Sequence, residues 1–78
     1  MKLYIYTIDQ TLYEGLADVI TLPSETGELS VLSSHAPIVT SLKKGNISIK
    51  TGTEQKTFPI EGGFAQINQE QTILLVRS

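Results

Sequence analysis

The chain has 78 residues, six of them Lys or Arg and eight Asp or Glu, which gives a net charge of −2. The charged residues form no run of either sign, which argues against nucleic acid as a partner. This length predicts one domain, 1–78, with little interior volume for a ligand pocket beside the core. Cysteine is absent, which excludes disulfides, thiolate catalysis and most structural zinc sites.

The first residues begin like a secretory signal but turn polar too early for one. Met1 to Tyr6 is largely apolar, but Thr7 and Asp9 follow before an apolar core of signal length is reached. No later stretch approaches the roughly 20 apolar residues of a membrane-spanning helix. We therefore expect no targeting segment, and we expect contact with a membrane only through a partner.

Short apolar runs, and no helical stripes, recur along the chain. Residues 3–6 and 19–22 are apolar on both faces, and so is the run 73–76 near the end. Runs of this length, bounded by turn residues, are typical of strands with both faces covered. We expect each to be a strand whose second face is covered by another part of the protein or by a partner.

Residues 46–61 have the pattern of a β-hairpin. Ile47 and Ile49 alternate with polar residues, which predicts a strand with one buried face. Turn-forming residues follow at 51–54, and the alternation then resumes. Pro59 has no N–H to donate, so we place the second strand at an edge of its sheet.

Turn-forming residues interrupt the chain roughly every eight to ten residues. The breaks fall at residues 9–10, 15, 23–27, 33–37, 43–45, 62–63 and 68–71. This spacing predicts roughly eight or more short strands. Such strands indicate an all-β fold with two antiparallel sheets packed face to face, or else a small barrel.

The residues that could carry chemistry point to no catalytic site. His35 is the only histidine and stands beside Ser33 and Ser34, but a nucleophile and its base normally come from separate elements, so we predict no catalytic residue. One imidazole without cysteine gives at most one good ligand, so we expect no metal and no cofactor. Glu25 and Glu28 could be paired carboxylates, but in an exposed turn we expect both to be solvated.

Two glycine-containing segments allow other interpretations. Gly62-Gly63 lacks the spacing of a phosphate-binding loop, so we assign it to a sheet corner or bulge, where glycine relieves steric limits. Lys43-Lys44-Gly45 could be the hairpin tip of a biotinyl or lipoyl carrier domain, although its flanking residues do not match one. That carrier domain is the alternative function, and a pocket-forming barrel or enzyme is a third hypothesis.

The segment His35-Ala36-Pro37 has a defined effect on the backbone. Pro37 fixes its own φ and pushes Ala36 into an extended conformation, so it stiffens the loop before the next strand. A stiff loop that carries an imidazole suits a binding interface, while a packed or backbone-bonded histidine is an equal alternative.

Several motifs follow one another in an order that covers nearly the whole chain. They are Gly27-Glu28-Leu29 with Leu32, His35-Ala36-Pro37, Thr40, Leu42-Lys43 with Gly45, and Gly62-Gly63-Phe64. This order resembles the N-terminal β-sandwich domain of the epsilon subunit of F-type ATP synthases. The family commonly has glycine at the positions of Ser30 and Ser34, and often proline at that of Ser33, so the loop before His35 departs from its pattern.

The resemblance implies a two-sheet antiparallel β-sandwich of about ten short strands. It also implies a non-catalytic rotor subunit of the central stalk that couples the gamma subunit to the c-ring during proton-driven ATP synthesis. Carried over residue by residue, it implies gamma contacts at Thr7, His35, Ala36, Pro37 and Thr40, c-ring contacts in a loop at Glu28 and Leu29, and structural turns at Gly27, Gly45, Gly62 and Gly63.

Longer members of this family continue into a pair of helices that is associated with inhibition and, in some bacteria, with ATP binding. The sequence reaches Ser78 without such helices, so we expect no C-terminal helical domain and no ATP binding. The resemblance places the protein at the cytoplasmic side of a bacterial inner membrane, held there by the complex. The stromal side of a chloroplast thylakoid is the alternative.

Overall fold

The computed structural model describes residues 1–33 and 36–78, which form strands and the turns between them. The strands are β1 (Lys2–Tyr6), β2 (Thr11–Leu16), β3 (Val19–Ser24), β4 (Gly27–Leu32), β5 (Ile38–Leu42), β6 (Gly45–Thr51), β7 (Glu54–Ile60), β8 (Gly62–Ile67) and β9 (Gln71–Arg77). The predicted all-β fold is confirmed, with 9 strands in the described ranges.

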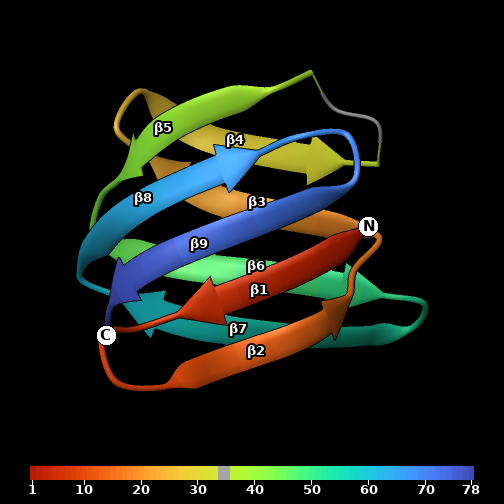
Figure 1. The fold of residues 1–78 in the computed structure, drawn as a ribbon, viewed down its shortest axis with the longest axis horizontal. Coiled ribbons are helices and arrows are strands. Elements are labelled where there is room, and N and C mark those ends of the chain that lie inside the picture. Colours follow the sequence, from red (N-terminus) through yellow and green to blue (C-terminus); the bar gives the residue numbers. More distant parts are fainter. Residues whose placement is uncertain (34–35) are drawn as a thin grey trace.

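The strands form one hydrogen-bonded sheet that curls into two layers (Figure 1). The sheet runs β2-β1-β9-β8-β5-β3-β6-β7, and β4 is attached to β3. β5 and β3 meet at a single residue pair, Leu42 opposite Ser24, so the sheet folds over at this joint. In Figure 1 the strands β2, β1, β9, β8 and β5 form the front layer, and β4, β3, β6 and β7 form the back layer.

β1 and β9 pair in parallel, which is the one exception among the described strands to the predicted antiparallel sandwich. Tyr4 lies opposite Ile73 and Tyr6 lies opposite Leu75. The other pairings between the described strands are antiparallel. Parallel neighbours cannot be joined by a tight turn, so the local turn signals that predict hairpins carry no information about this pair from the two ends of the chain.

The hydrophobic core lies between the layers and is built from alternate side chains of both. It consists of Leu3, Ile5, Ala17, Ile20, Leu22, Val31, Leu42, Ile47, Ile49, Ile60, Ala65, Ile67, Leu74 and Val76. The predicted buried face of Ile47 and Ile49 is confirmed, because these residues are 0% and 2% exposed. The core fixes which face of each strand points outward, and therefore which side chains can meet a partner.

β6 and β7 form the predicted hairpin, with Thr51 opposite Glu54 across its turn. β7 is the last strand in the hydrogen-bonding order, so the placement of Pro59 on an edge strand is confirmed. Proline suits this position because an edge strand needs no donor on its outer side.

Side chains close the seam between β2 and β7, the two strands at the ends of the sheet order. The ring of Tyr13 on β2 packs edge-on against Phe58 on β7, with 6.1 Å between the ring centroids. The Lys56 ammonium lies 5.5 Å from the centroid of the Tyr13 ring, and the Tyr13 hydroxyl donates to the carbonyl of Leu16 at 2.9 Å. The layers are thus held together along this side by aromatic packing.

Gly63 lies where two backbones approach too closely for a side chain. A Cβ at this residue would lie 2.8 Å from the Cα of Val76 on the neighbouring strand. Gly45 is similarly confined, because its Cβ would lie 2.8 Å from the Cβ of Pro23. Gly27, where β4 leaves the turn after β3, has a φ of 127°, a conformation that favours glycine.

Candidate interaction surfaces

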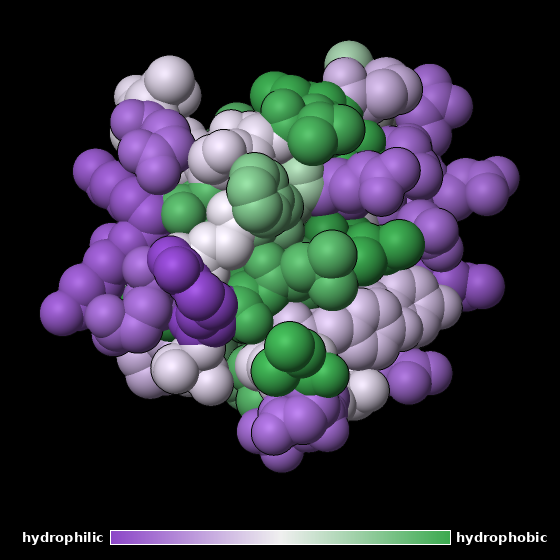
Figure 2. Space-filling view, turned by 60° about the vertical axis from the view of Figure 1, so that its left-hand side comes forward, coloured by the Kyte–Doolittle hydropathy of each residue, from purple (hydrophilic) through white to green (hydrophobic). Residues whose placement is uncertain are grey.

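The outer face of the front layer carries large apolar side chains. Two cross-strand rows on this face run Tyr6-Leu75-Phe64-Ser41 and Tyr4-Ile73-Gln66-Val39. We call Tyr4, Tyr6, Val39, Phe64, Ile73 and Leu75 the apolar face. Val39 is 73%, Phe64 60% and Leu75 55% exposed. Figure 2 shows hydrophobic surface gathered across one side of the molecule and bordered by hydrophilic side chains, and contiguous exposed apolar surface of this kind marks an interaction site.

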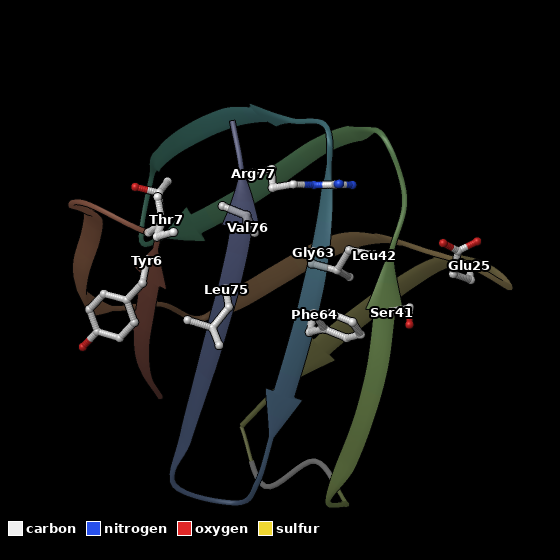
Figure 3. A pocket seen from close by; sticks show the side chains of 11 residues that line it. Tyr6, Thr7, Glu25, Ser41, Leu42, Gly63, Phe64, Leu75, Val76 and Arg77 are labelled. Carbon is white, nitrogen blue, oxygen red and sulfur yellow. The ribbon is translucent and has the colours of Figure 1, made fainter.

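A cleft of about 500 Å³ opens at one end of the apolar face (Figure 3). Tyr6, Phe64 and Leu75 supply its apolar lining from β1, β8 and β9. Glu25 and Arg77 contribute an anion and a cation to the same cleft. An apolar surface with charged groups at its margin suits the side chains of a protein partner.

Thr7 lies at this cleft, in the turn between β1 and β2. Its hydroxyl donates to the Asp9 carboxylate at 3.1 Å and accepts the amide of Gln10 at 3.2 Å. The cleft also contains Leu42, the last residue of β5, whereas Pro37 precedes the first residue of that strand. The structure therefore does not bring Thr7 together with the predicted gamma contacts at the start of β5.

The other described residues predicted to contact gamma lie at β5. Ala36 and Pro37 lead into this strand, and Thr40 stands within it. Thr40 lies opposite the buried Ala65, so its side chain faces the interior and is partly exposed. His35 lies outside the described residues. The structure thus brings Ala36, Pro37 and Thr40 to one strand at the margin of the apolar face.

Glu28 and Leu29 lie in strand β4, which corrects the prediction that both stand in a loop. β4 pairs with β3 from Gly27 onward, so the chain is already in the sheet at Glu28. Leu29 lies opposite the buried Leu22 and packs against the core. Glu28 is exposed and shares a hollow of about 420 Å³ with Lys43. Of the two predicted c-ring contacts, Glu28 is the one that the fold presents to a partner.

Val39, Phe64 and Leu75 are exposed residues of the apolar face that the sequence alone did not single out as contacts. The available signal for Leu75 was the run 73–76. This run is apolar on both faces, which predicted a strand whose second face is covered by another part of the protein or by a partner. In the structure this strand buries Leu74 in the core and exposes Leu75 on the other face. Val39 and Phe64 point outward because the next residue on each strand, Thr40 and Ala65, faces the interior.

The described residues hold no group of three or more His, Cys, Asp or Glu that could bind a metal ion. Lys43 and Lys44, considered as a carrier tip, form the turn between β5 and β6, where the Lys44 ammonium lies 3.9 Å from the Glu61 carboxylate. In the part of the chain that the structure describes, no helix is long and apolar enough to cross a membrane.

Comparison with known proteins identifies a family and sequence relatives for this chain. The family model "ATP synthase, Delta/Epsilon chain, beta-sandwich domain" matches residues 1–78. The chloroplastic ATP synthase epsilon chain of Tupiella akineta is 38% identical over 100% of this chain, which spans 60% of that relative. The ATP synthase epsilon chain of Caulobacter vibrioides is 36% identical over 86% of this chain and 78% of its own length.

A solved structure has the same fold. It is a chain in the cryo-EM structure of the Euglena gracilis mitochondrial ATP synthase, OSCP/F1/c-ring in rotational state 1. The TM-score is 0.91 over 97% of this chain and 49% of that chain, at 24% sequence identity. At this level of identity the likeness establishes a common architecture.

Proposed function

Since this chain belongs to the family of the ATP synthase delta/epsilon β-sandwich domain, we propose that it is a non-catalytic part of the central stalk of an F-type ATP synthase. In this role it binds the gamma subunit, rests on the c-ring and couples the two during proton-driven ATP synthesis. It catalyses no reaction and carries no cofactor. Membership in this family displaces the carrier-domain hypothesis.

The apolar face is the observation that carries this proposal. A domain of this size that worked alone would not be expected to leave Phe64, Leu75 and Val39 more than half exposed on one surface. Covering such a surface with a partner removes apolar area from water, which is the main favourable term in association. We assign the apolar face and the cleft beside it to the gamma subunit.

The remaining predicted gamma contacts fit around this surface. Ala36, Pro37 and Thr40 belong to β5 or its approach, at one margin of the apolar face, and Thr7 lines the cleft at another. His35 stays in the proposal from the family resemblance alone. In this arrangement the apolar face supplies most of the affinity, while the polar residues at its margin set orientation.

Glu28 is assigned to the c-ring. It lies on the outer surface of β4 in the back layer, away from the apolar face, so the two partners can be bound at the same time. Lys43 lines the same hollow, so a partner there meets both an anion and a cation. Contacts of this kind favour orientation and on-rate more than affinity.

The fold suits the transmission of torque. The single curled sheet, the packed core and the Tyr13–Phe58 seam leave few independently movable parts. Close-packed interiors have low compressibility and transmit strain. A joint between two larger rotor parts needs this stiffness.

The proposed location is peripheral to the membrane, where the whole complex holds the chain. The relatives are epsilon chains of bacteria and of chloroplasts. We propose the cytoplasmic side of a bacterial inner membrane, with the stromal side of the chloroplast thylakoid as the alternative.

Reconstitution tests this function. An ATP synthase depleted of its epsilon subunit is incorporated into vesicles, the purified chain is added, and proton-driven ATP synthesis and co-sedimentation of the chain are measured. We expect the chain to sediment with the complex and to raise synthesis above that of the depleted enzyme. A chain that stays in the supernatant while the native epsilon subunit sediments would refute the proposal.

A further inference from the structure

One side of β5 pairs with no described strand except at its last residues. β5 bonds to β8 along one side, whereas on the other side it meets β3 only at Leu42. At that joint the amide of Glu25 donates to the carbonyl of Ser41 at 3.1 Å. Backbone groups alternate between the two sides of an antiparallel strand, so the N–H and C=O of Val39 point to the same free side as the carbonyl of Ser41. No described strand pairs with Val39 there.

The free edge of β5 also lacks the residues that normally prevent strands from pairing with one another. Natural edge strands carry charges, proline, glycine or bulges that make them poor templates for another strand. The residues of β5, Ile-Val-Thr-Ser-Leu, include none of these, and Pro37 stands just before the strand begins. The other described strands with a free edge each carry such residues: Glu14 and Gly15 on β2, Gly27 and Glu28 on β4, and Glu54, Lys56 and Pro59 on β7.

This edge is continuous with the apolar face. Val39 lies opposite Gln66 on the outer face of the front layer, and its side chain is 73% exposed. A strand added beside β5 would therefore place alternate side chains next to Val39 and extend the apolar face by one strand. Because β5 presents no charge, the complementary segment is uncharged on the side that it lays against this face.

We propose that the gamma subunit contributes an extended, uncharged segment that adds to β5 as a further strand, with the N–H and C=O of Val39 as its central hydrogen-bonding pair. This inference rests on the proposed function and specifies how gamma is held. Strand addition takes affinity from backbone hydrogen bonds and specificity from alternate side chains, so register is set as well as contact. Such a joint would fix the rotational position of the sandwich on gamma.

Amide hydrogen exchange reads out strand addition directly. We would measure the exchange rate of each β5 amide by NMR in the wild-type chain, free and bound to purified gamma subunit. The Val39 amide should exchange rapidly in the free chain and at least about tenfold more slowly in the complex, because a new backbone hydrogen bond protects it. The Thr40 amide, which faces β8, should be protected in both states and serves as the internal control.

Two substitutions at the same position separate the backbone donor from the side chain. Val39→Ala removes most of the side chain and keeps the N–H, whereas Val39→Pro also removes the N–H. Proline is tolerated where the N–H of an edge strand faces away from the ladder, so the β5–β8 pairing should survive. We expect Val39→Pro to bind gamma at least about tenfold more weakly than Val39→Ala, a difference of ~1.4 kcal/mol.

The outcomes distinguish this inference from the function on which it rests. If the wild-type chain binds gamma and the Val39 amide is not slowed, strand addition is wrong while the proposed function stands. If the wild-type chain does not bind gamma, both are wrong. If Val39→Pro fails to fold, the exchange measurement on the wild-type chain still decides the question.

Discussion

Phe64 on β8 and Leu75 on β9 lie directly opposite each other on the outer face of the front layer, and both remain more than half exposed. Cross-strand apolar pairs stabilise sheets mainly where their surfaces are removed from water. In the free chain most of the surface of this pair stays in water and contributes little stability. A partner that covers the pair would remove this surface from water. The pair is therefore the most direct place to separate binding from folding.

Phe64→Lys should weaken binding to the gamma subunit at least about tenfold, because it places a charge in the centre of an apolar contact. The free energy of unfolding should change by less than about 0.5 kcal/mol, as is usual for exposed positions. Titration calorimetry and urea denaturation measure the two quantities. Thr57→Lys, on the exposed edge strand β7 of the back layer, is the matched control and should leave binding unchanged. Equal losses in both variants would count against the apolar face as the site.

Glu28→Gln should weaken binding to the isolated c-ring a few-fold and leave binding to gamma unaltered. The substitution keeps the shape of the side chain and removes its charge, and exposed ion pairs contribute little each. The loss should shrink as salt is raised, since salt screens exposed charges. Surface-immobilised c-ring at two salt concentrations provides the measurement, with Ser30→Ala on the same strand as control. A salt-independent loss, or a loss of gamma binding, would contradict the assignment.

Gly63→Ala should destabilise the chain by about 2 kcal/mol or more, because the new Cβ would lie 2.8 Å from the Cα of Val76, where only a backbone shift makes room. Gly27→Ala is the comparison variant. Both glycines have a positive φ, but no atom lies within 4 Å of the new Cβ at Gly27, so this substitution should cost less, about 1 kcal/mol. Urea denaturation ranks the two. The reverse order would mean that the β8–β9 approach is looser than described.

Tyr13 and Phe58 should be energetically coupled across the seam between β2 and β7. A double-mutant cycle with Tyr13→Leu and Phe58→Leu should give a coupling free energy of about 0.5–1.5 kcal/mol, the usual range for edge-to-face aromatic pairs. The cycle of Phe58→Leu with Tyr6→Leu, whose ring stacks on Tyr4 and not on Phe58, should be additive. Additivity in both cycles would show that the aromatic contact does not close the seam.

The strand pattern was predictable because burial of one face imposes a period of two. Ile47 and Ile49 show this most clearly, since the alternation alone identified the face that the structure buries. Pro59 was predictable for a different reason, because a residue without an N–H is confined to positions that need no donor. Such local constraints act between neighbouring residues and can therefore be recognised in the sequence.

Relationships between distant segments were not predictable in this way. The parallel pairing of β1 with β9 depends on which strands the curled sheet brings together, and no turn between them records it. Glu28 was expected in a loop from the family resemblance, whereas the turn that forms is short enough for Gly27 already to lie opposite Ser24 in the sheet. The apolar face likewise exists only once β1, β9, β8 and β5 lie side by side, because each strand contributes only one or two of its residues.

The most direct test of the central claim is a calorimetric titration of the wild-type chain with purified gamma subunit at several temperatures. The account predicts saturable one-to-one binding with a negative heat-capacity change, because the apolar face is removed from water in the complex. Absence of saturable binding, under conditions in which the full epsilon subunit of a relative binds gamma, would contradict it.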